Sequence, residues 1–542
     1  MKIFKFKNIF VILSLVCVGV ASCIKNDLPY PVIELTIDNI TGQGFVTGSV
    51  DYSTRIVTLE LEEQTNLKIV TVDSVSYTEE AELSTPIVGV HDLRDPLYVT
   101  LSFYQDYDWT IMANQDIERY FKVSGQIGDE VIDVENQTMT AYVTESKDLL
   151  DIEVKSLKIG PADSTVMSPA LSDLTQFITY RTVTVKYHGL EEKWKLYVEH
   201  SDVKVAFTLC EAWANCFWLE AAGDTSLECG FRYKVSGDSD WIDVSQDDIT
   251  YGDGVFSANI EGTSSSTDYE FIAYSGDDVT VVEERTSDVL VKLENGGFEE
   301  WSQPSKSWLP YSSEASQYWS TGNEGATTLG DSYNLTTPLY SDVRIGSSGE
   351  ISAKLQSKNV LVKFAAGNLF VGRYISTDVT NGIVGFGQSF TSRPVALKGW
   401  VKYNSGVIDI VGSTPAGVSI VKDQTTDIGM IYIALGDWTP EEYGLNPKTG
   451  VMVGTDETPV VIHTAYTSSF FDPYGDNVIA YGELELTESV DEWTEFVIPL
   501  NYSDKSRIPT NLIIVNSASK YGDYFTGSTS SYMILDDFEL VY

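Results

Sequence analysis

The stretch Thr182-Val183-Thr184-Val185-Lys186-Tyr187 alternates polar and apolar side chains, and so does Trp194-Lys195-Leu196-Tyr197-Val198. Because successive side chains of a β-strand point to opposite faces, this period of two predicts strands with one buried face. Ile56-Val57-Thr58-Leu59-Glu60-Leu61 follows the same rule, and turns such as Asn295-Gly296-Gly297 separate the runs. After residue 22 no pattern indicates an amphipathic helix longer than two turns. We therefore predict an all-β protein of several sandwiches.

The first 23 residues resemble the leader of a bacterial lipoprotein. Three lysines precede an apolar stretch from Ile9 to Val20, which is shorter than the roughly 20 residues of a transmembrane helix. Val20-Ala21-Ser22-Cys23 resembles a lipobox, in which the cysteine is lipidated and becomes the new N-terminus. The alternative is an ordinary signal peptide with an incidental cysteine. The resemblance implies a signal peptide over 1–22, lipid attachment at Cys23 and an anchor linker over 23–30.

The position of the anchored protein is a further expectation. The residue after Cys23 is Ile24, not an acid. By analogy with lipoprotein sorting, this predicts an outer membrane lipoprotein at the cell surface, joined to the membrane through its lipid. Glycan-uptake proteins of the outer membrane are then candidate partners.

The composition excludes several classes of function. The chain of 542 residues has 79 acidic and 35 basic side chains, with a formal net charge of −44 at pH 7. Such a balance repels phosphate backbones, so nucleic acid is not an expected partner. Only four histidines are present, which argues against a histidine-based active site or a His-rich zinc site. Cys210, Cys216 and Cys229 allow at most one disulfide, or they are three small buried residues.

An internal repeat lies near the N-terminus. Residues 54–115 and 136–200 carry corresponding strand patterns, offset by 82 residues at Leu67/Leu149 and by 85 at Trp109/Trp194. We interpret them as two Ig-like sandwiches over 31–118 and 119–200. The equivalent tryptophans are then core anchors, and two equivalent copies favour a spacer over a catalyst.

Residues 201–292 resemble a fibronectin type III module. The resemblance rests on the pattern around the tyrosine corner of that fold, formed by Ile260, Gly262, Thr267, Tyr269, Phe271 and Ala273. Trp218, two residues after Cys216, falls where that fold buries a tryptophan of its second strand. Such modules are usually spacers.

Residues 293–542 form the longest unit, and their ends are informative. The start Asn295-Gly296-Gly297-Phe298-Glu299 and the end Asp536-Asp537-Phe538-Glu539-Leu540 resemble galactose-binding-type β-jelly-rolls, which are common among carbohydrate-binding modules. The resemblance implies adjacent first and last strands and a structural calcium shared by Glu299 and Asp536, because carboxylates are ligands that calcium prefers. Alternation along the last strand also places Asp536 on the side of Phe538 and Leu540. The alternative is that both acids cap strand ends in water. We expect no other cofactor.

Longer strings inside this unit resemble a known family. They include 363–370, 385–390, 397–400 and 517–528. Together they resemble the putative carbohydrate metabolism domain, found at the C-terminus of lipoproteins from glycan-degrading Gram-negative bacteria. The family implies a jelly-roll and a link to carbohydrate use, but it supplies no catalytic set.

Candidate catalytic residues do not stand out. A glycosidase needs two carboxylates about 5–10 Å apart across a sugar cleft, and this acidic chain offers many pairs. Glu483 and Glu485 share a strand face, and Asp472, Asp476 and Asp523 fall in expected loops. The chain contains no Gly-x-Ser-x-Gly, His-Glu-x-x-His or phosphate-binding loop. The catalytic residues thus remain unknown.

Binding has more support than catalysis. Sugar rings stack on Trp and Tyr, and polar side chains beside them bond the hydroxyls. Aromatic residues in loops rich in Gly and Ser are the natural candidates. The predicted carbohydrate-binding residues are Trp308, Tyr311, Tyr318, Trp319, Phe471, Tyr474, Lys520, Tyr521 and Tyr524.

The sequence therefore predicts a surface lipoprotein in which three sandwich modules form a stalk and a jelly-roll binds a polysaccharide or oligosaccharide. One alternative is a glycoside hydrolase that uses paired carboxylates of the C-terminal domain. Another is an adhesin or fimbria-like structural protein, for which tandem sandwiches are equally suited.

Overall fold

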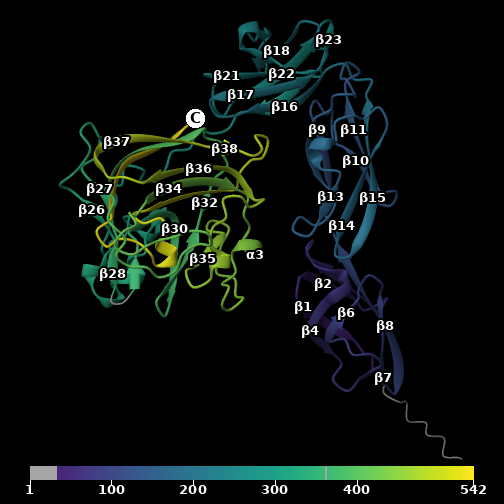
Figure 1. The fold of residues 1–542 in the computed structure, drawn as a ribbon, viewed down its shortest axis with the longest axis horizontal. Helices are drawn as coiled ribbons and strands as arrows, with labels where there is room; N and C mark the ends of the chain where they lie inside the picture. The colour runs from purple at the N-terminus through teal and green to yellow at the C-terminus, as the bar shows by residue number, and fades with distance from the viewer. Residues whose placement is uncertain (1–32, 361–362) are drawn as a thin grey trace, which may run out of the picture. The chain divides into compact units, whose positions relative to one another are not determined.

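The computed structural model describes residues 33–360 and 363–542, and it confirms the all-β class (Figure 1). The predicted lipid attachment at Cys23 lies outside the described residues. Within them, no helix combines the length and apolarity needed to cross a membrane. Contacts divide the chain into two compact units, with the division close to residue 200. The predicted domain boundaries near residues 119, 201 and 293 stay predictions.

The first Ig-like repeat is a sandwich of two sheets. One sheet has the order β1-β4-β6, with β1 (Ile37–Gly42), β4 (Val70–Tyr77) and β6 (Gly89–His91). The other has the order β2-β3-β8-β7-β5, with β2 (Phe45–Asp51), β3 (Ile56–Leu61), β8 (Gln105–Gln115), β7 (Leu97–Phe103) and β5 (Glu82–Leu83). A short 3-10 turn, η1 (Leu67–Ile69), leads into β4.

The second repeat has the same arrangement with fewer strands. β9 (Tyr120–Val123) pairs with β12 (Val154–Lys158), and the facing sheet has the order β10-β11-β15-β14-β13. Its strands are β10 (Val131–Asp133), β11 (Thr138–Val143), β15 (Leu190–His200), β14 (Arg181–Tyr187) and β13 (Val166–Ser168), and η2 (Leu171–Asp173) precedes β14. Trp109 on β8 and Trp194 on β15 are each 1% exposed, as expected for equivalent core anchors.

The third module is a fibronectin-like sandwich. One sheet has the order β16-β17-β21-β20, with β16 (Ala206–Ala212), β17 (Cys216–Ala222), β21 (Val255–Glu261) and β20 (Ile249–Tyr251). The other has the order β19-β18-β22-β23, with β24 also on β22: β19 (Ile242–Asp243), β18 (Cys229–Val235), β22 (Asp268–Ser275), β23 (Asp278–Val279) and β24 (Glu283–Thr286). A 3-10 turn, η3 (Gln246–Asp248), precedes β20.

Two side chains test the fibronectin resemblance. The Tyr269 hydroxyl accepts a hydrogen bond from the Ser264 backbone N–H at 3.0 Å, which is the tie of a tyrosine corner. The expected burial of Trp218 is wrong, because Phe217 occupies the core and Trp218 points to the opposite face of β17. A one-residue shift in a strand moves a side chain to the other face. Cys210, Cys216 and Cys229 are free and buried.

The C-terminal domain is a two-sheet jelly-roll, as predicted. Its larger sheet has the order β35-β31-β30-β39-β34-β36-β38, with β25 on β30 and β32 on β39. These strands are β35 (Val460–His463), β31 (Asn381–Phe386), β30 (Asn368–Asp378), β39 (Asn511–Ser517), β34 (Gly429–Gly436), β36 (Val478–Leu486), β38 (Asn501–Tyr502), β25 (Trp319–Ser320) and β32 (Gln388–Ser389).

The smaller sheet of this domain has the order β26-β27-β40-β33-β37, and β28 pairs with β29 outside it. These strands are β26 (Thr336–Leu339), β27 (Ser352–Gln356), β40 (Tyr532–Val541), β33 (Ala396–Asn404), β37 (Val490–Pro499), β28 (Lys358–Val360) and β29 (Lys363–Ala365). The short helical turns are η4 (Glu314–Ser316), α2 (Asn323–Ala326), η5 (Thr327–Leu329), η6 (Asp331–Tyr333), α3 (Pro440–Tyr443), η7 (Thr467–Ser469) and η8 (Gly522–Tyr524). The Phe538 N–H donates to the Gly296 carbonyl at 2.8 Å, so the start of the domain lies beside its last strand.

The third module and the C-terminal domain belong to one compact unit, and Arg393 joins them. Its guanidinium, only 3% exposed, donates to Asp288 at 2.7 and 2.9 Å and to Glu211 at 2.7 Å. The Trp213 ring lies 4.6 Å from the Tyr502 ring at the same joint. Removing one partner of such a buried pair is costly, so we expect these two modules to move together.

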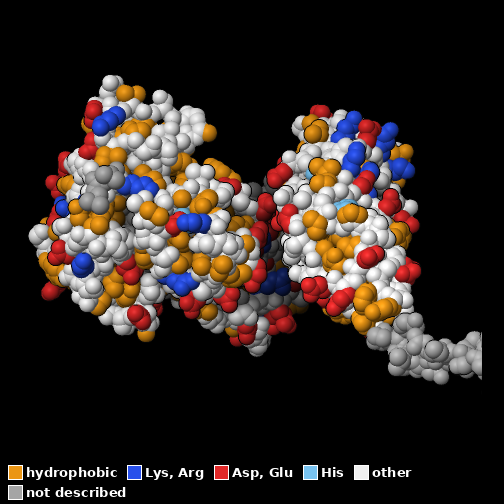
Figure 2. Space-filling model, turned by 90° about the horizontal axis from the view of Figure 1, so that it is seen from below, with side chains coloured by type: hydrophobic (Ala, Val, Ile, Leu, Met, Phe, Trp, Pro, Cys, Tyr) orange, Lys and Arg blue, Asp and Glu red, His pale blue; other side chains and the backbone are white. Residues whose placement is uncertain are grey.

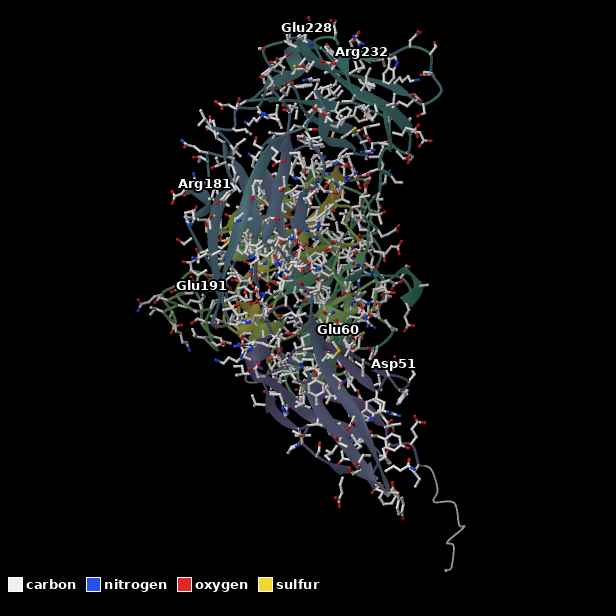
Figure 3. All side chains as sticks on the ribbon, turned by 90° about the vertical axis from the view of Figure 1, so that its right-hand side faces the viewer. Asp51, Glu60, Arg181, Glu191, Glu228 and Arg232 are labelled. Carbon is white, nitrogen blue, oxygen red and sulfur yellow. The ribbon has the colours of Figure 1, made fainter. Side chains whose placement is uncertain are left out.

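Acidic side chains are scattered over the visible surface, between hydrophobic, basic and other side chains (Figure 2). In the repeats they project from the outer faces and ends of strands, as Asp51 and Glu191 do (Figure 3). The surface charge that the composition predicts is thus distributed rather than gathered in one acidic tail.

Candidate functional site

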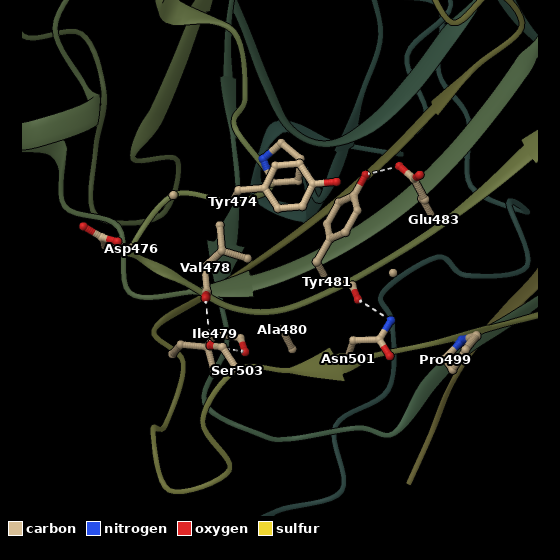
Figure 4. Close-up of a pocket in the computed structure, with 13 residues that line it drawn as sticks. Tyr474, Asp476, Val478, Ile479, Ala480, Tyr481, Glu483, Pro499, Asn501 and Ser503 are labelled. Atoms are coloured by element: carbon tan, nitrogen blue, oxygen red, sulfur yellow. Dashed lines mark hydrogen bonds between the residues drawn. The ribbon is translucent and has the colours of Figure 1, made fainter. Parts of the chain in front are cut away.

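A cleft of the C-terminal domain lies over β36 and β38, at one edge of the larger sheet. Its volume is 720 Å³. Thirteen residues line it, and they come from β36, from the loop before it and from the turn into β38 (Figure 4). Ala480 and Tyr481 of β36 pair with Tyr502 and Asn501 of β38, so a two-strand ladder forms the base.

Two tyrosines give this cleft its aromatic surface. Tyr474 comes from the loop before β36 and is 89% exposed, while Tyr481 is half-buried on β36 itself. Burial, and then the hydrogen bond to Glu483, raise the pKa of Tyr481, so its hydroxyl keeps its proton. An exposed ring beside a fixed ring is suited to stacking against a flat apolar face.

Polar groups surround the two rings. The Tyr481 hydroxyl donates to the Glu483 carboxylate at 2.6 Å. Asp476 and Asn501 are exposed elsewhere along the lining. In Figure 4, Asp476 and Glu483 lie on either side of the tyrosine rings. The cleft therefore offers several hydrogen-bond acceptors around an aromatic centre.

Gly482 is required where β36 passes the end of β37. A Cβ on Gly482 would lie 2.3 Å from the Pro499 carbonyl oxygen, so a side chain there would push the two strands apart. Gly482 and Pro499 both line the cleft. The lack of a side chain at Gly482 therefore lets β36 and the end of β37 lie close together at this side of the cleft.

The loop that carries Tyr474 is held at its base. The Phe471 ring stacks on Tyr432 of β34 at 5.4 Å and 11°, and Tyr432 lies 6.0 Å from Tyr481. Phe471 also lines a second cleft of 310 Å³ on the other side of this loop. The base is rigid through packing, whereas Tyr474 at the tip remains open to ligand.

A second loop, between β39 and β40, is tied to the domain by a buried carboxylate. Asp427, which is fully buried, accepts hydrogen bonds from Ser519 Oγ, the Ser528 N–H and Ser531 Oγ at 2.7 to 2.9 Å. Burial raises the pKa of Asp427. These three donors satisfy the carboxylate and fix both ends of the loop.

The same loop supplies side chains near the first one. Tyr524 meets Phe470 edge to face at 5.2 Å, and Lys520 pairs with Glu485 on the outer face of β36. The Lys520 ammonium lies 5.9 Å from the Tyr521 ring centroid. The two loops therefore meet above the outer face of the sheet.

Asp523 is the unusual acid of this second loop. Its side chain keeps contact with solvent, but the protein around it displaces much of the bulk water and raises its pKa to about 6. Burial raises the pKa of Tyr432 on β34, and the charge of Asp523 raises it further. A carboxyl with a pKa near 6 keeps a larger protonated fraction near neutral pH than an ordinary aspartate, which suits a general acid.

The structure separates the predicted binding residues into two groups. Phe471 and Tyr474 lie at the two clefts, and Lys520, Tyr521 and Tyr524 lie on the neighbouring loop. Those of the first stretch, Trp308, Tyr311, Tyr318 and Trp319, lie in a different segment and line neither cleft.

Trp319 cannot contact a ligand on the surface, so its prediction as a binding residue is wrong. It is 0% exposed, packs against Phe298 at 5.3 Å and donates its ring N–H to the Glu294 carbonyl at 2.8 Å. Tyr311 is also buried, and Tyr318 packs against the same core. These rings close the end of the sandwich.

The cleft also contains residues that sequence reasoning did not assign to binding. Tyr481, Asp476 and Asn501 are the main ones, and Glu483 was noted only as one acid of a pair on a strand face. The available signal was the alternation Tyr481, Glu483, Glu485 on one face of a strand whose other face is apolar.

The two predicted calcium ligands, Glu299 and Asp536, have different surroundings. The two Glu299 carboxylate oxygens accept the N–H groups of Glu350 and Ile351 at 3.0 Å. The aspartate beside Glu299 is Asp537, since both lie within 3.8 Å of the position that a Cβ on Gly297 would take. Among the described residues, no three Asp, Glu, His or Cys side chains converge as a metal site.

The last strand also departs from simple alternation. Asp537 has a φ of 50° at a register shift, so Leu535 and Phe538 both enter the core. The predicted shared face of Asp536 and Phe538 is therefore wrong, because a bulge resets the alternation. One oxygen of Asp536 is buried without a hydrogen bond, and burial and the Asp537 charge raise its pKa to about 6. Calcium binding by Glu299 and Asp536 stays a prediction.

Comparison with known proteins bears on the C-terminal domain most directly. Residues 297–541 match the family model of the putative carbohydrate metabolism domain. This confirms the resemblance found in the sequence and links the domain to carbohydrate metabolism. Comparison with curated proteins gave no match.

Solved structures with similar folds include two described as putative glycoside hydrolases. The one from Bacteroides thetaiotaomicron aligns over 95% of this chain and 98% of its own, at 13% identity and a TM-score of 0.29. The one from Bacteroides vulgatus aligns over 45% and 96%, at 23% identity and a TM-score of 0.32. A surface glycan-binding protein from Prevotella bryantii aligns over 77% and 89%, at 10% identity and a TM-score of 0.17.

Proposed function

We propose that the C-terminal domain binds a polysaccharide or oligosaccharide in the cleft over β36 and β38. The observation that supports this most is the exposed Tyr474 ring beside Tyr481, with Glu483, Asp476 and Asn501 around them. Sugars present an apolar C–H face and a rim of hydroxyls, and a cleft of this kind matches both features. The family match of residues 297–541 adds the link to carbohydrates.

In this proposal, the rest of the chain positions the C-terminal domain at the cell surface. The two Ig-like repeats and the fibronectin-like module act as a stalk, and lipid on Cys23 anchors the stalk to the outer membrane at the cell surface. The stalk then holds the cleft away from the membrane for glycan capture. Radiolabelled palmitate should label the wild type but not Cys23→Ala, and equal labelling would reject the anchor.

Tyr474→Ala is the direct test of the cleft. Removing an exposed stacking ring should cost about 1–3 kcal/mol of binding free energy, or about tenfold or more in Kd. Binding is measured by affinity electrophoresis through gels that contain single polysaccharides. The matched control is Tyr340→Ala, which removes another exposed tyrosine of the same domain that lines neither cleft. Equal loss in both variants would contradict the proposed site.

Hydrolysis is the second candidate, and Asp523 is the observation that favours it. A general acid in a glycosidase needs a raised pKa and a second carboxylate on the other side of the sugar. Asp523 lies on the second loop and not in the cleft, so the sugar would have to extend from the cleft to this loop, with Glu483 or Glu485 on β36 as the second carboxylate. Release of reducing ends from a polysaccharide over hours, abolished by Asp523→Asn, would establish the enzyme. Retention of the polysaccharide without release favours capture.

A further inference from the structure

The charge of the cleft lining limits the ligands it can take. Among its thirteen residues, all of them described, two are carboxylates, Asp476 and Glu483, and none is Lys or Arg. A negatively charged ligand that entered would face two like charges without a cation to offset them. This repulsion acts at short range, because both acids line the cleft that the ligand would enter.

Two cations of the segments around the cleft are held by other carboxylates. Arg507 donates to both oxygens of Asp437 at 2.8 and 2.7 Å, and its other nitrogen donates to the Asp476 backbone carbonyl at 3.0 Å. Lys520 pairs with Glu485. An incoming carboxylate or sulfate would therefore have to displace an existing ion pair, which offsets what it would gain.

The hydrogen-bonding groups of the cleft also favour an uncharged ligand. The Tyr481 proton is already donated to Glu483, and the Asn501 amide N–H points to the Tyr481 carbonyl at 3.4 Å. The side-chain donors that remain for a ligand are the Tyr474 hydroxyl and the second amide proton of Asn501. Most side-chain groups left for a ligand are acceptors, namely the Asp476 and Glu483 carboxylates and the Asn501 carbonyl. Such groups accept from sugar hydroxyls, whereas carboxylate and sulfate groups have no proton to donate.

We infer that this cleft selects uncharged glycans and rejects those that carry carboxylate or sulfate groups, with Asp476 and Glu483 as the residues that discriminate. The inference rests on the proposed glycan-binding function. The net charge of −44 adds a long-range repulsion, but salt screens it beyond about 8 Å at 0.15 M. Local discrimination by two acids in the cleft persists in higher salt, which separates it from the general charge of the chain.

The experiment uses matched pairs of polysaccharides and the full chain. Hydroxyethyl cellulose is compared with carboxymethyl cellulose, dextran with dextran sulfate, and pectic galactan with polygalacturonan. Binding is measured at 0.15 M and 0.5 M NaCl. We expect the neutral member of at least one pair to bind about tenfold or more tightly than its anionic partner at both salt concentrations, because the repulsion acts at short range.

The variants identify the residues responsible. The double variant Asp476→Asn, Glu483→Gln should narrow that difference by about tenfold, because it removes the charges that repel the anionic member. The readout is the ratio of the two affinities, so it does not depend on how far the amides change neutral binding itself. The control, Asp247→Asn with Asp248→Asn, removes two charges from exposed residues of the third module and should change neither affinity.

The outcomes separate the two proposals. Anionic members that bind as tightly as the neutral ones, or discrimination that both double variants remove equally, would overturn the inference and leave glycan binding intact. If no member of any pair binds, the glycan-binding function fails and this inference fails with it. If discrimination vanishes at 0.5 M NaCl in the wild type, it belongs to the overall charge, and the assignment to Asp476 and Glu483 is wrong.

Discussion

Two aromatic segments of the C-terminal domain have loop-like sequences and opposite structures. The segment 308–319 places its rings among Pro, Ser and Glu residues, and the segment 470–481 places its rings among Pro, Gly and Asp residues. In the first, Trp319 is 0% exposed, while in the second Tyr474 is 89% exposed. Aromatic residues in a loop-like stretch therefore do not indicate a binding surface, and what decides is how the stretch is anchored.

The anchors differ in kind. Asn323, fully buried on α2, donates to the carbonyls of Trp308 and Thr336, and its own carbonyl accepts from the N–H groups of Leu335 and Thr336, at 2.6 to 3.0 Å. These bonds close the first segment onto the core. The second segment is held by the stack of Phe471 on Tyr432 at its base and by Arg507 at the Asp476 carbonyl, but Tyr474 between them is 89% exposed. Its tip is therefore available to ligand.

The largest effect is expected for Trp319→Ala. Loss of a fully buried tryptophan leaves a cavity, and such changes cost about 3–5 kcal/mol of the free energy of unfolding. Tyr474→Ala, in contrast, should change that free energy by less than about 0.5 kcal/mol, because the ring is exposed. Urea unfolding of both variants measures the contrast. Similar losses in the two would mean that Tyr474 packs as a core residue.

Sequence reasoning succeeded where the decisive information is local. The alternation in β14 and β15 and the two ends of the C-terminal domain predict strands and a jelly-roll. It failed for Trp319, because that residue is buried by pairing with Val371, about fifty positions away. It failed for Asp536 because the strand bulges at Asp537. The residues before the bulge therefore alternate out of step with Phe538 and Leu540, and Asp536 lies on the opposite face from them. The cleft combines β36, β38 and a loop, and only the fold brings them together.

Asn323→Ala tests the anchor of the closed segment. It leaves four buried backbone hydrogen-bonding groups without their partner, each of which costs about 1–3 kcal/mol before water fills part of the space. We expect a loss of about 3 kcal/mol in the free energy of unfolding, and a red shift of tryptophan emission as Trp308 gains solvent. Asn501→Ala is the control, since that amide is exposed at the cleft. A loss below about 1 kcal/mol for Asn323→Ala would show that packing alone closes the segment.

The contribution of an acid to stability should depend on its burial, as it does for the aromatic residues. Asp536 is fully buried with a pKa raised from 3.8 to about 6, so its ionisation opposes folding. Stability should therefore fall as the pH rises from about 4 to about 6, and the penalty is fully present above that range. Asp536→Asn should raise the free energy of unfolding by about 2–3 kcal/mol at pH 7 in EDTA, and have little effect at pH 3.5.

The same variant tests the predicted calcium site. If calcium raises the Tm of the wild type and Asp536→Asn removes that rise, Asp536 is a ligand and its charge is compensated by the metal. If calcium and EDTA give the same Tm, the structural calcium is rejected. A variant that is less stable than the wild type in EDTA at pH 7 would contradict the expected cost of burying the charge.

The smallest effect is expected for Lys520→Ala, which tests how far the exposed binding surface extends. Lys520 and its partner Glu485 are each about a third exposed, and such ion pairs contribute about 0–1 kcal/mol to stability. Lys520 does not line the cleft, so the affinity for a neutral glycan should stay within about twofold, equivalent to less than about 0.5 kcal/mol. Binding is measured beside Tyr474→Ala under the same conditions. A tenfold loss would mean that the ligand runs from the cleft across the outer face of β36 to the second loop, where Tyr521 and Tyr524 would then contact it as the sequence predicts.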